Sequence, residues 1–193
     1  NAQPGDVRFK DMNGDGVIND NDKTYSGTGI AKVEANLNLS ASYKGFDFSA
    51  VIGSAFGNKI YNGIRYYYEG MNSASNFLSS TLDAWTPTHT NTSVPRAIYG
   101  DPNDNTREST RFLENGDFVR LRQVQLGYTL PTSLVKKIYC DRIRFYVSAE
   151  NVFTITGYSG ANPEFSMGVL NSGIDRFTYP FSRSYTVGAQ VSF

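Results

Sequence analysis

The residues best suited to chemistry lie in one short stretch, DMNGDGVINDND, at positions 11–22. Oxygen-bearing side chains alternate along it, and a glycine stands where the backbone must turn sharply. This spacing matches the calcium-binding loop of EF-hand proteins, which supplies oxygens from positions one, three, five, seven and twelve. The predicted ligands are Asp11, Asn13, Asp15, the backbone carbonyl of Val17, and Asp22.

The loop departs from the EF-hand pattern in ways that bear on its use. Asp22 stands where a bidentate Glu is usual, so its shorter side chain predicts weaker binding. No amphipathic helix pattern flanks the loop, which argues against a calcium-sensing helix pair. We expect Ca²⁺ in a structural role, filled at the ~0.1 to 1 mM concentrations that extracellular modules need. The alternative is a polar turn without metal.

Other chemistry has little support in this sequence. The only histidine, His89, lies among Thr and Asn without the partners of a Ser-His-Asp hydrolase, and no Gly-x-Ser-x-Gly motif is present. A glycosidase pair among Glu114, Asp117 and Glu150 cannot be judged from sequence, because the chemistry depends on their separation. Lys and Arg number 18, as do Asp and Glu, so no basic field favours nucleic acid. The sequence predicts a protein that is not an enzyme and does not bind nucleic acid.

The elements that must position the loop are β-strands, because apolar residues recur with a period of two. In VEANLNLSASY, residues 33–43, every odd position is apolar and every even position is polar. Four further stretches show the same period: FDFSAVIGSAFG, DFVRLRQVQLGYTL, RIRFYVSAENVFTI and SRSYTVGAQVSF. The apolar phase changes within the third stretch, which predicts a β-bulge near Arg122 and Gln123. The expected fold is all-β and antiparallel.

The lengths of the connections alternate along the chain. Residues 44–45 and 131–141 make short connections, the latter with a helical turn predicted at SLVKKI, whereas residues 58–116 and 156–181 make long ones. Transmembrane β-barrels of the outer membrane have short periplasmic turns and long extracellular loops. If the C-terminus is periplasmic, the alternation of short and long connections places both long connections outside the cell. The segment 1–32, with its calcium loop, is then also outside.

Strand length and face chemistry also suit a transmembrane barrel. Eleven residues at ~3.3 Å each, tilted by about 40°, cross the ~25 Å apolar band of such a barrel. The apolar faces carry no charged residue, while the opposite faces carry Arg120, Arg144 and Glu150, as a polar lumen requires. Because five strands cannot close a barrel in lipid, we expect the remaining strands upstream. A soluble antiparallel sandwich with one solvated face is the alternative.

Aromatic residues mark the first long connection. Tyr66, Tyr67 and Tyr68 are consecutive, and Trp85 follows. They are candidates for contact with a ligand or with a covering lipoprotein, and equally for the aromatic girdle at the membrane interface.

Several motifs resemble one known family over nearly the whole chain. They are PGDVRFKDMNGDGVINDND, LNLSASYKGFDFSAVIGSAFGNKIYN, WTPTHTNTSVPR, RFLENGDFVRLRQVQLGYTLP, RIRFYVSAENVFTITGYSGANPEF and YPFSRSYTVGAQVSF. In this order they resemble the C-terminal region of SusC/RagA-type TonB-dependent outer-membrane transporters.

The resemblance implies the C-terminal part of a large transmembrane β-barrel with long extracellular loops, from a Bacteroidetes-like source. It implies outer-membrane lipid around the barrel, a SusD-like surface lipoprotein as lid, and energy from TonB through an N-terminal region not present here. It implies import of glycan or oligopeptide, and recognition of the terminal Phe193 by the barrel-assembly machinery. On this basis we divide the chain into the segment 1–32 and the barrel strands and loops of 33–193. A secreted calcium-binding β-domain that binds glycan remains the alternative function.

Overall fold

The structure is a computed structural model that describes residues 2–72, 74, 76–165, 168 and 171–193. Among these residues the strands are β1 (Val33–Tyr43), β2 (Phe46–Phe56), β3 (Lys59–Asn62), β4 (Leu113–Asn115), β5 (Phe118–Thr129), β6 (Arg142–Thr156), β7 (Ile174–Asp175) and β8 (Ser184–Ser192). The helices are α1 (Gly63–Tyr68) and α2 (Thr132–Val135), with 3-10 turns at Asp20–Asp22, Ser79–Asp83, Thr110–Phe112 and Lys136–Ile138.

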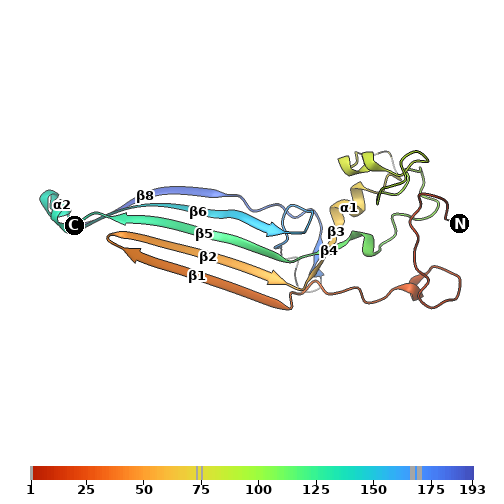
Figure 1. The fold of residues 1–193 in the computed structure, drawn as a ribbon, viewed down its shortest axis with the longest axis horizontal. Coiled ribbons are helices and arrows are strands. Elements are labelled where there is room, and N and C mark those ends of the chain that lie inside the picture. The colour runs from red at the N-terminus through yellow and green to blue at the C-terminus, as the bar shows by residue number, and fades with distance from the viewer. Residues whose placement is uncertain (1, 73, 75, 166–167, 169–170) are drawn as a thin grey trace. The chain divides into compact units, whose positions relative to one another are not determined.

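The five long strands form one antiparallel sheet in the order β1-β2-β5-β6-β8 (Figure 1). These are the five strands predicted from the period of two, with ends that agree to within about two residues. Lys44 and Gly45 join β1 to β2 with positive φ angles of 45° and 88°. Two successive positive φ angles form the tight turn that matches the right-handed twist of a hairpin. The predicted antiparallel all-β fold is confirmed.

The register places the apolar side chains of all five strands in common rows. One row runs from Leu39 through Ala50, Val124 and Ala149 to Tyr185, each residue paired with the next across the sheet. A slip of one residue in any strand would move its apolar side chains to the polar face. The alternating pattern therefore sets the register as well as the strands.

A bulge in β5 restores this register where the sequence changes phase. Leu121 and Gln123 pair with successive residues of β2, so Arg122 between them has no partner in that ladder. The ladder to β6 shifts at the same point, and there Asn151 takes a positive φ of 52°. The bulge predicted near Arg122 and Gln123 is confirmed, and it lets both halves of β5 present apolar side chains to one face.

The apolar face of this sheet is open. Leu37, Phe145 and Val187 expose 52%, 51% and 84% of their surface, and many of their neighbours on the same face are exposed to similar extents. The buried apolar cluster is small and consists of Val135, Cys140 and Ile143, with Leu130 packed against it. An exposed apolar face of this extent marks a surface that another apolar phase must cover.

Among the described residues, no helix is both long and apolar enough to cross a membrane.

On the opposite face of the sheet, paired charged side chains lie over glycine residues of the strands. Arg144 donates from Nε to Asp47 Oδ1 at 2.9 Å and from Nη2 to Asp47 Oδ2. A Cβ atom on Gly127 would collide with this ion pair, and one on Gly188 would collide with the ring of Tyr146. These glycines give Arg144 and Tyr146 room to lie flat on the strands.

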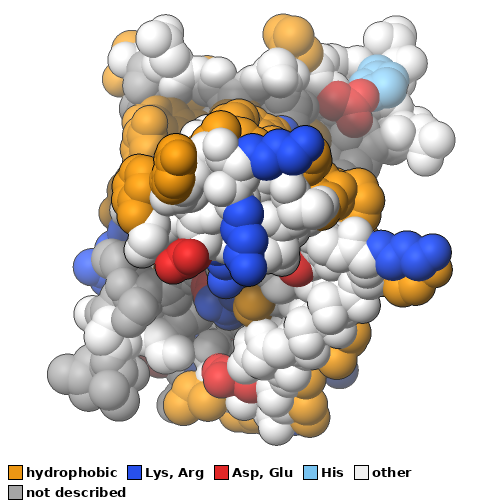
Figure 2. All heavy atoms as spheres, turned by 90° about the vertical axis from the view of Figure 1, so that its left-hand side faces the viewer, with side chains coloured by type: hydrophobic (Ala, Val, Ile, Leu, Met, Phe, Trp, Pro, Cys, Tyr) orange, Lys and Arg blue, Asp and Glu red, His pale blue; other side chains and the backbone are white. Residues whose placement is uncertain are grey.

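The short connection between β5 and β6 contains α2 and the 3-10 turn that follows it, which confirms the helical turn predicted at SLVKKI. The last turn carries Lys136 and Lys137. Figure 2 views the molecule from the side on which α2 lies in Figure 1, and Lys and Arg side chains are prominent on that face.

The chain folds into two compact units. One unit comprises the five-stranded sheet with residues 30–58, 115–165 and 178–193, and the other comprises residues 1–29, 59–114 and 166–177. The second unit joins the N-terminal segment to the larger part of the first long connection and to a piece of the second. The sequence division at residue 32 follows chain order, whereas this division follows proximity in space. Residues 73 and 75 of connection 58–116, and 166–167 and 169–170 of connection 156–181, lie outside the described residues.

The second unit contains short elements that the sequence analysis did not predict. β3 pairs in parallel with β7, Tyr61 opposite Ile174 and Asn62 opposite Asp175. Asn62 then begins α1, because its side chain accepts a hydrogen bond from the Arg65 backbone N–H at 3.1 Å. Elements of two to six residues are too short to show a period, so the long connections were predicted only as loops.

Substitution Asp47→Ala should destabilise the folded protein, because it leaves the Arg144 guanidinium without its carboxylate partner. The control is Ser49→Ala on the same face of β2, for which we expect a change within ~0.5 kcal/mol. Urea unfolding of the full-length protein refolded in lipid vesicles measures the free energy of unfolding of each variant. Equal stability of the two variants would contradict the structural role assigned to this ion pair.

Candidate functional site

The predicted calcium loop is held by hydrogen bonds from its own backbone. Asp11 Oδ1 accepts from the Gly14 N–H at 2.7 Å, and Asp11 Oδ2 accepts from the Gly16 N–H at 2.8 Å. Gly16 has the positive φ, 81°, that the sequence pattern predicts at the sharp turn. The first predicted ligand thus organises the first half of the loop.

Asp22 closes the loop from its other end. Its Oδ1 accepts from the Met12 N–H at 2.7 Å and its Oδ2 accepts from the Asn19 N–H at 2.8 Å. The bonds from Asn19 and Met12 hold the pKa of the Asp22 carboxyl below its ordinary value. Asp15 accepts from the Val17 N–H at 2.8 Å in the same manner.

The donor set of this loop fits calcium in its chemistry. Carboxylate, amide and carbonyl oxygens are the ligands of this cation, and an oxygen that accepts one N–H keeps a second lone pair. Among the described residues, however, no group of three or more His, Cys, Asp or Glu side chains is close enough to hold a metal ion. Calcium would draw the side chains of Asp11, Asp15 and Asp22 together. Calcium binding stays a prediction.

The three consecutive tyrosines have different environments. Tyr66 packs edge-on against Phe112 at 5.5 Å between ring centroids, and Phe112 is fully buried. Tyr67 and Tyr68 are 60% and 39% exposed, and each contacts Phe177, at 5.7 and 5.6 Å. Tyr66 is half-buried between Phe112 and Tyr67, whose ring lies 5.1 Å away, while Tyr67, Tyr68 and Phe177 present rings at the surface.

Trp85 lies against the N-terminal segment. A Cβ atom on Gly5 would collide with the Trp85 ring, so the ring lies directly on the Gly5 backbone. The Arg96 N–H donates to the Gly5 carbonyl at 2.9 Å, and the Trp85 N–H donates to the Val94 carbonyl at 3.0 Å. The motif WTPTHTNTSVPR, residues 85–96, thus packs around the motif PGDVR, residues 4–8. We call these two segments together the N-terminal clasp.

A buried ion pair fastens this clasp. Arg96 donates from Nε and Nη2 to the two oxygens of Asp6, at 2.6 and 3.0 Å, and Asn105 Nδ2 adds a bond to Oδ1 at 3.0 Å. The Asp6 side chain is 0% exposed. The hydrogen bond from Arg96 lowers the pKa of Asp6 to about 2, with Asn105 and the Gln3 N–H acting in the same direction. Sequence reasoning missed this pair because its partners are far apart along the chain.

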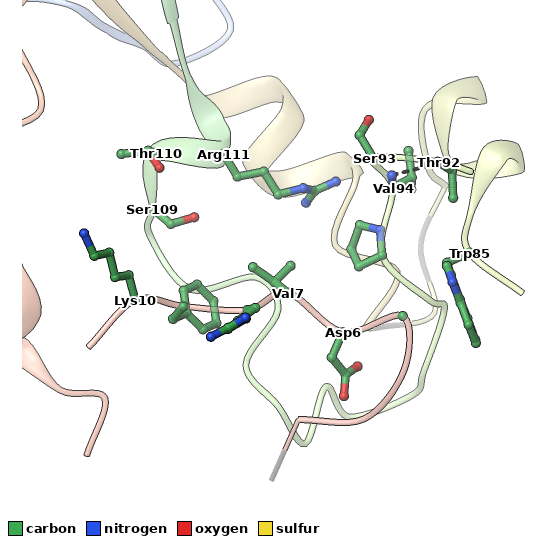
Figure 3. A pocket seen from close by; sticks show the side chains of 14 residues that line it. Asp6, Val7, Lys10, Trp85, Thr92, Ser93, Val94, Ser109, Thr110 and Arg111 are labelled. Carbon is green, nitrogen blue, oxygen red and sulfur yellow. Dashed lines mark hydrogen bonds between the residues drawn. The ribbon is translucent and has the colours of Figure 1, made fainter. Parts of the chain in front are cut away.

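A cavity of about 630 Å³ adjoins the clasp (Figure 3). Its walls come from residues 5–10, from Trp85 with residues 92–95, and from residues 109–111. Trp85 is the only one of the four predicted aromatic contacts that lines it. In Figure 3 the Arg111 side chain extends toward the segment that carries Ser93 and Val94.

Arg120, a predicted lumen residue, organises the polar face of the sheet. It donates to Thr154 Oγ1 at 2.8 Å, to Glu164 Oε2 at 2.9 Å and to Asn162 Oδ1 at 2.6 Å. Arg122 donates to the other oxygen of Glu164 at 2.8 Å. These bonds tie the connection after β6 to the face opposite the apolar one, so this connection covers part of the polar face.

The remaining candidates lie at the surface. Phe193 is 88% exposed and directly follows β8. His89 Nε2 lies 2.7 Å from Asp83 Oδ1, and Thr92 donates to the second oxygen of that carboxylate at 2.9 Å. His89 and Thr86 also exchange backbone hydrogen bonds, so His89 stabilises a turn. The expectation that the protein is not an enzyme stays a prediction.

No protein-family model matches the chain. Its sequence is 32% identical over 199 residues to TonB-dependent receptor P3 from Formosa agariphila, over 100% of this chain and 19% of that protein. It is 28% identical over 194 residues to TonB-dependent receptor SusC from Bacteroides thetaiotaomicron, over 100% of this chain and 18% of that protein. The solved structure of the RagAB peptide transporter matches with a TM-score of 0.74 and 30% identity, over 88% of this chain and 18% of that one.

Antiparallel strands with one open apolar face and one charged face agree with the wall strands of a transmembrane β-barrel, and the structural neighbours are RagA barrels. The comparisons confirm the resemblance to the C-terminal region of SusC/RagA-type TonB-dependent outer-membrane transporters. The chain spans about a fifth of the length of the relatives that it matches.

The Asp6–Arg96 clasp should weaken in acid. Because the folded-state pKa of Asp6 is about 2 and lies below its unfolded value, the ion pair stabilises the fold above about pH 4 and is lost as the pH falls towards 2. Hydrogen exchange of the backbone amides of Gln3, Asp6 and Val7, corrected for intrinsic rates, should therefore rise over this range.

The variant Asp6→Asn should show fast exchange at neutral pH and no rise between pH 4 and 2. Asp20→Asn, an exposed carboxylate of the same compact unit, is the control and should exchange as the natural protein does. A pH profile unchanged by Asp6→Asn would refute the assignment.

Proposed function

We propose that this chain forms part of the wall and extracellular loops of a TonB-dependent importer of nutrients in the bacterial outer membrane. The proposal rests on one observation: the apolar side chains of all five strands lie in register on a single face that the protein leaves open. Similarity to TonB-dependent receptors over the whole chain supports the same function. With lipid on the open face, the charged face lines the lumen.

The proposed partners follow from the same family. A SusD-like surface lipoprotein would cover the extracellular side, TonB would act through an N-terminal region, and the barrel-assembly machinery would read the strand that ends in Phe193. The substrate would be a glycan or an oligopeptide, and one structural relative is named a peptide transporter. Residues 1–32 and the two long connections would lie outside the cell, where Tyr66, Tyr67, Tyr68 and Trp85 could meet ligand or lid.

Two adjacent residues of β1 test which face meets lipid. Leu39 is on the apolar face and Asn38 on the polar face near the middle of the strand. An arginine at the bilayer midplane costs ~2 to 4 kcal/mol, whereas a lumen substitution costs little. In the full-length protein, Leu39→Arg should reduce the heat-modifiable, membrane-inserted fraction severalfold, and Asn38→Arg should leave it unchanged.

Equal insertion of the two variants would refute the assignment of faces. A full-length product that is soluble, monomeric and not heat-modifiable would refute the barrel itself and favour a secreted β-domain.

We also propose that the loop of residues 11–22 binds one calcium ion in a structural role. Its support is the oxygen-only donor set, the positive φ at Gly16, and the closure of the loop by Asp11 and Asp22. Bound calcium would stabilise this loop and the N-terminal segment that precedes it.

Asp15→Ala removes one predicted ligand without touching the bonds of Asp11 and Asp22. We expect calcium affinity to fall about tenfold or more in calorimetry on the full-length protein, because a charged oxygen ligand is lost. Asp20→Ala is the matched control, since Asp20 is exposed and pairs with Lys23 outside the predicted ligand set. Unchanged calcium binding in Asp15→Ala would remove the site.

A further inference from the structure

The cavity beside the N-terminal clasp has a cationic side. Arg8, Lys10 and Arg111 line it, and its one acidic residue is Asp6. Both oxygens of Asp6 are bound by Arg96, so this carboxylate does not compensate the charge of the cavity. Arg111 is paired with Glu69, so the excess positive charge of the lining comes from the exposed Arg8 and Lys10, and it favours an anionic ligand.

Two side chains beside the cavity have hydrogen-bonding groups without a partner. Arg111 uses Nη2 to bind Glu69 Oε2 at 3.2 Å, and its side chain is only 13% exposed. Its Nε and Nη1 atoms, and the Ser109 hydroxyl, are buried and have no hydrogen-bond partner among the described residues. A buried donor without a partner is costly, and more so when it is charged, so these groups favour an acceptor that can reach them.

Apolar side chains also line the cavity. Val7, Val94, Pro95 and Trp85 contribute to it, and Figure 3 shows Val7 and Val94 near the Arg111 side chain. The volume of about 630 Å³ lies within the range of small-molecule sites and far exceeds the space that an inorganic ion fills. Cationic and apolar side chains in one cavity suit an organic anion better than phosphate or sulfate.

We propose that this cavity binds an organic carboxylate that carries an apolar group beside its charge, with the carboxylate on Arg111 and Ser109. This binding mode requires the two side chains to turn toward the cavity, because their unpartnered atoms are covered in the structure. Two nutrients offer this chemistry: the C-terminal end of a short peptide, and a sugar acid. The site rests on the proposed function, because a solute captured here would be one that the importer meets outside the cell.

The test measures binding to the full-length transporter in detergent, after its heat-modifiable migration has shown that the barrel is formed. The probes are the tripeptide Ala-Leu-Leu with a free carboxylate, the same tripeptide with a C-terminal amide, and a disaccharide of glucuronic acid. We expect at least one of the two carboxylates to bind and the amide to bind at least tenfold more weakly than the acid. Binding of the tripeptide acid identifies the ligand as a peptide C-terminus, and binding of the glucuronic acid disaccharide identifies it as a sugar acid.

Three variants locate the site. Arg111→Gln should weaken binding roughly tenfold or more, since a buried charged hydrogen bond is lost. Arg8→Gln with Lys10→Gln removes two exposed charges at the rim without disturbing the buried network, and should weaken binding about threefold. Arg176→Gln removes an exposed arginine of the same compact unit that does not line the cavity, and should leave binding unchanged.

Equal binding of the acid and the amide would overturn the proposal, as would binding of neither carboxylate to a heat-modifiable protein. The proposal is also overturned if neither Arg111→Gln nor the double variant Arg8→Gln with Lys10→Gln changes the affinity. These outcomes leave the barrel assignment intact, because heat modifiability is established first.

Discussion

The common register of five long strands is the constraint on which the rest of the structure depends. Backbone hydrogen bonds join neighbouring strands, and the period of two sends every second side chain to the same face. Once Leu39 is paired with Ala50, and Ala50 with Val124, the position of every other side chain in the sheet follows. The bulge at Arg122 keeps this pairing where the sequence changes phase. A continuous apolar face is the result, and lipid is the phase that would cover it.

The two faces are stabilised by different means. The apolar face needs only size and hydrophobicity, so it mixes Leu, Val, Ala and aromatic residues freely. The polar face carries charges that would be costly if left unpaired, and each buried arginine there has specific acceptors: Arg144 has Asp47, and Arg120 has Asn162 and Glu164. Glycines in the strands make space for these long side chains. A wall between lipid and a wet lumen would have this division of chemistry.

The N-terminal segment is fastened by its own chemistry rather than by the sheet. Asp6 and Arg96 form a buried pair, and Trp85 covers Gly5, so two motifs about eighty residues apart form one structure. The predicted calcium loop follows directly after this segment. The cavity lined by Arg111 adjoins the same clasp.

The strands and their faces could be predicted because period, length and turn chemistry are local signals, as at the hairpin of Lys44 and Gly45. The alternating oxygen-bearing side chains of residues 11–22 can be recognised in the sequence for the same reason. Whether these oxygens point at one metal ion cannot be read from the sequence. The short strand β3 could not be predicted, since it pairs with the distant β7. The sequence by itself determined the strands, the two faces and the resemblance to a transporter family. The tertiary structure alone decided which distant charges pair and which remain without partners, because long-range contacts depend on chain geometry and leave no periodic signal.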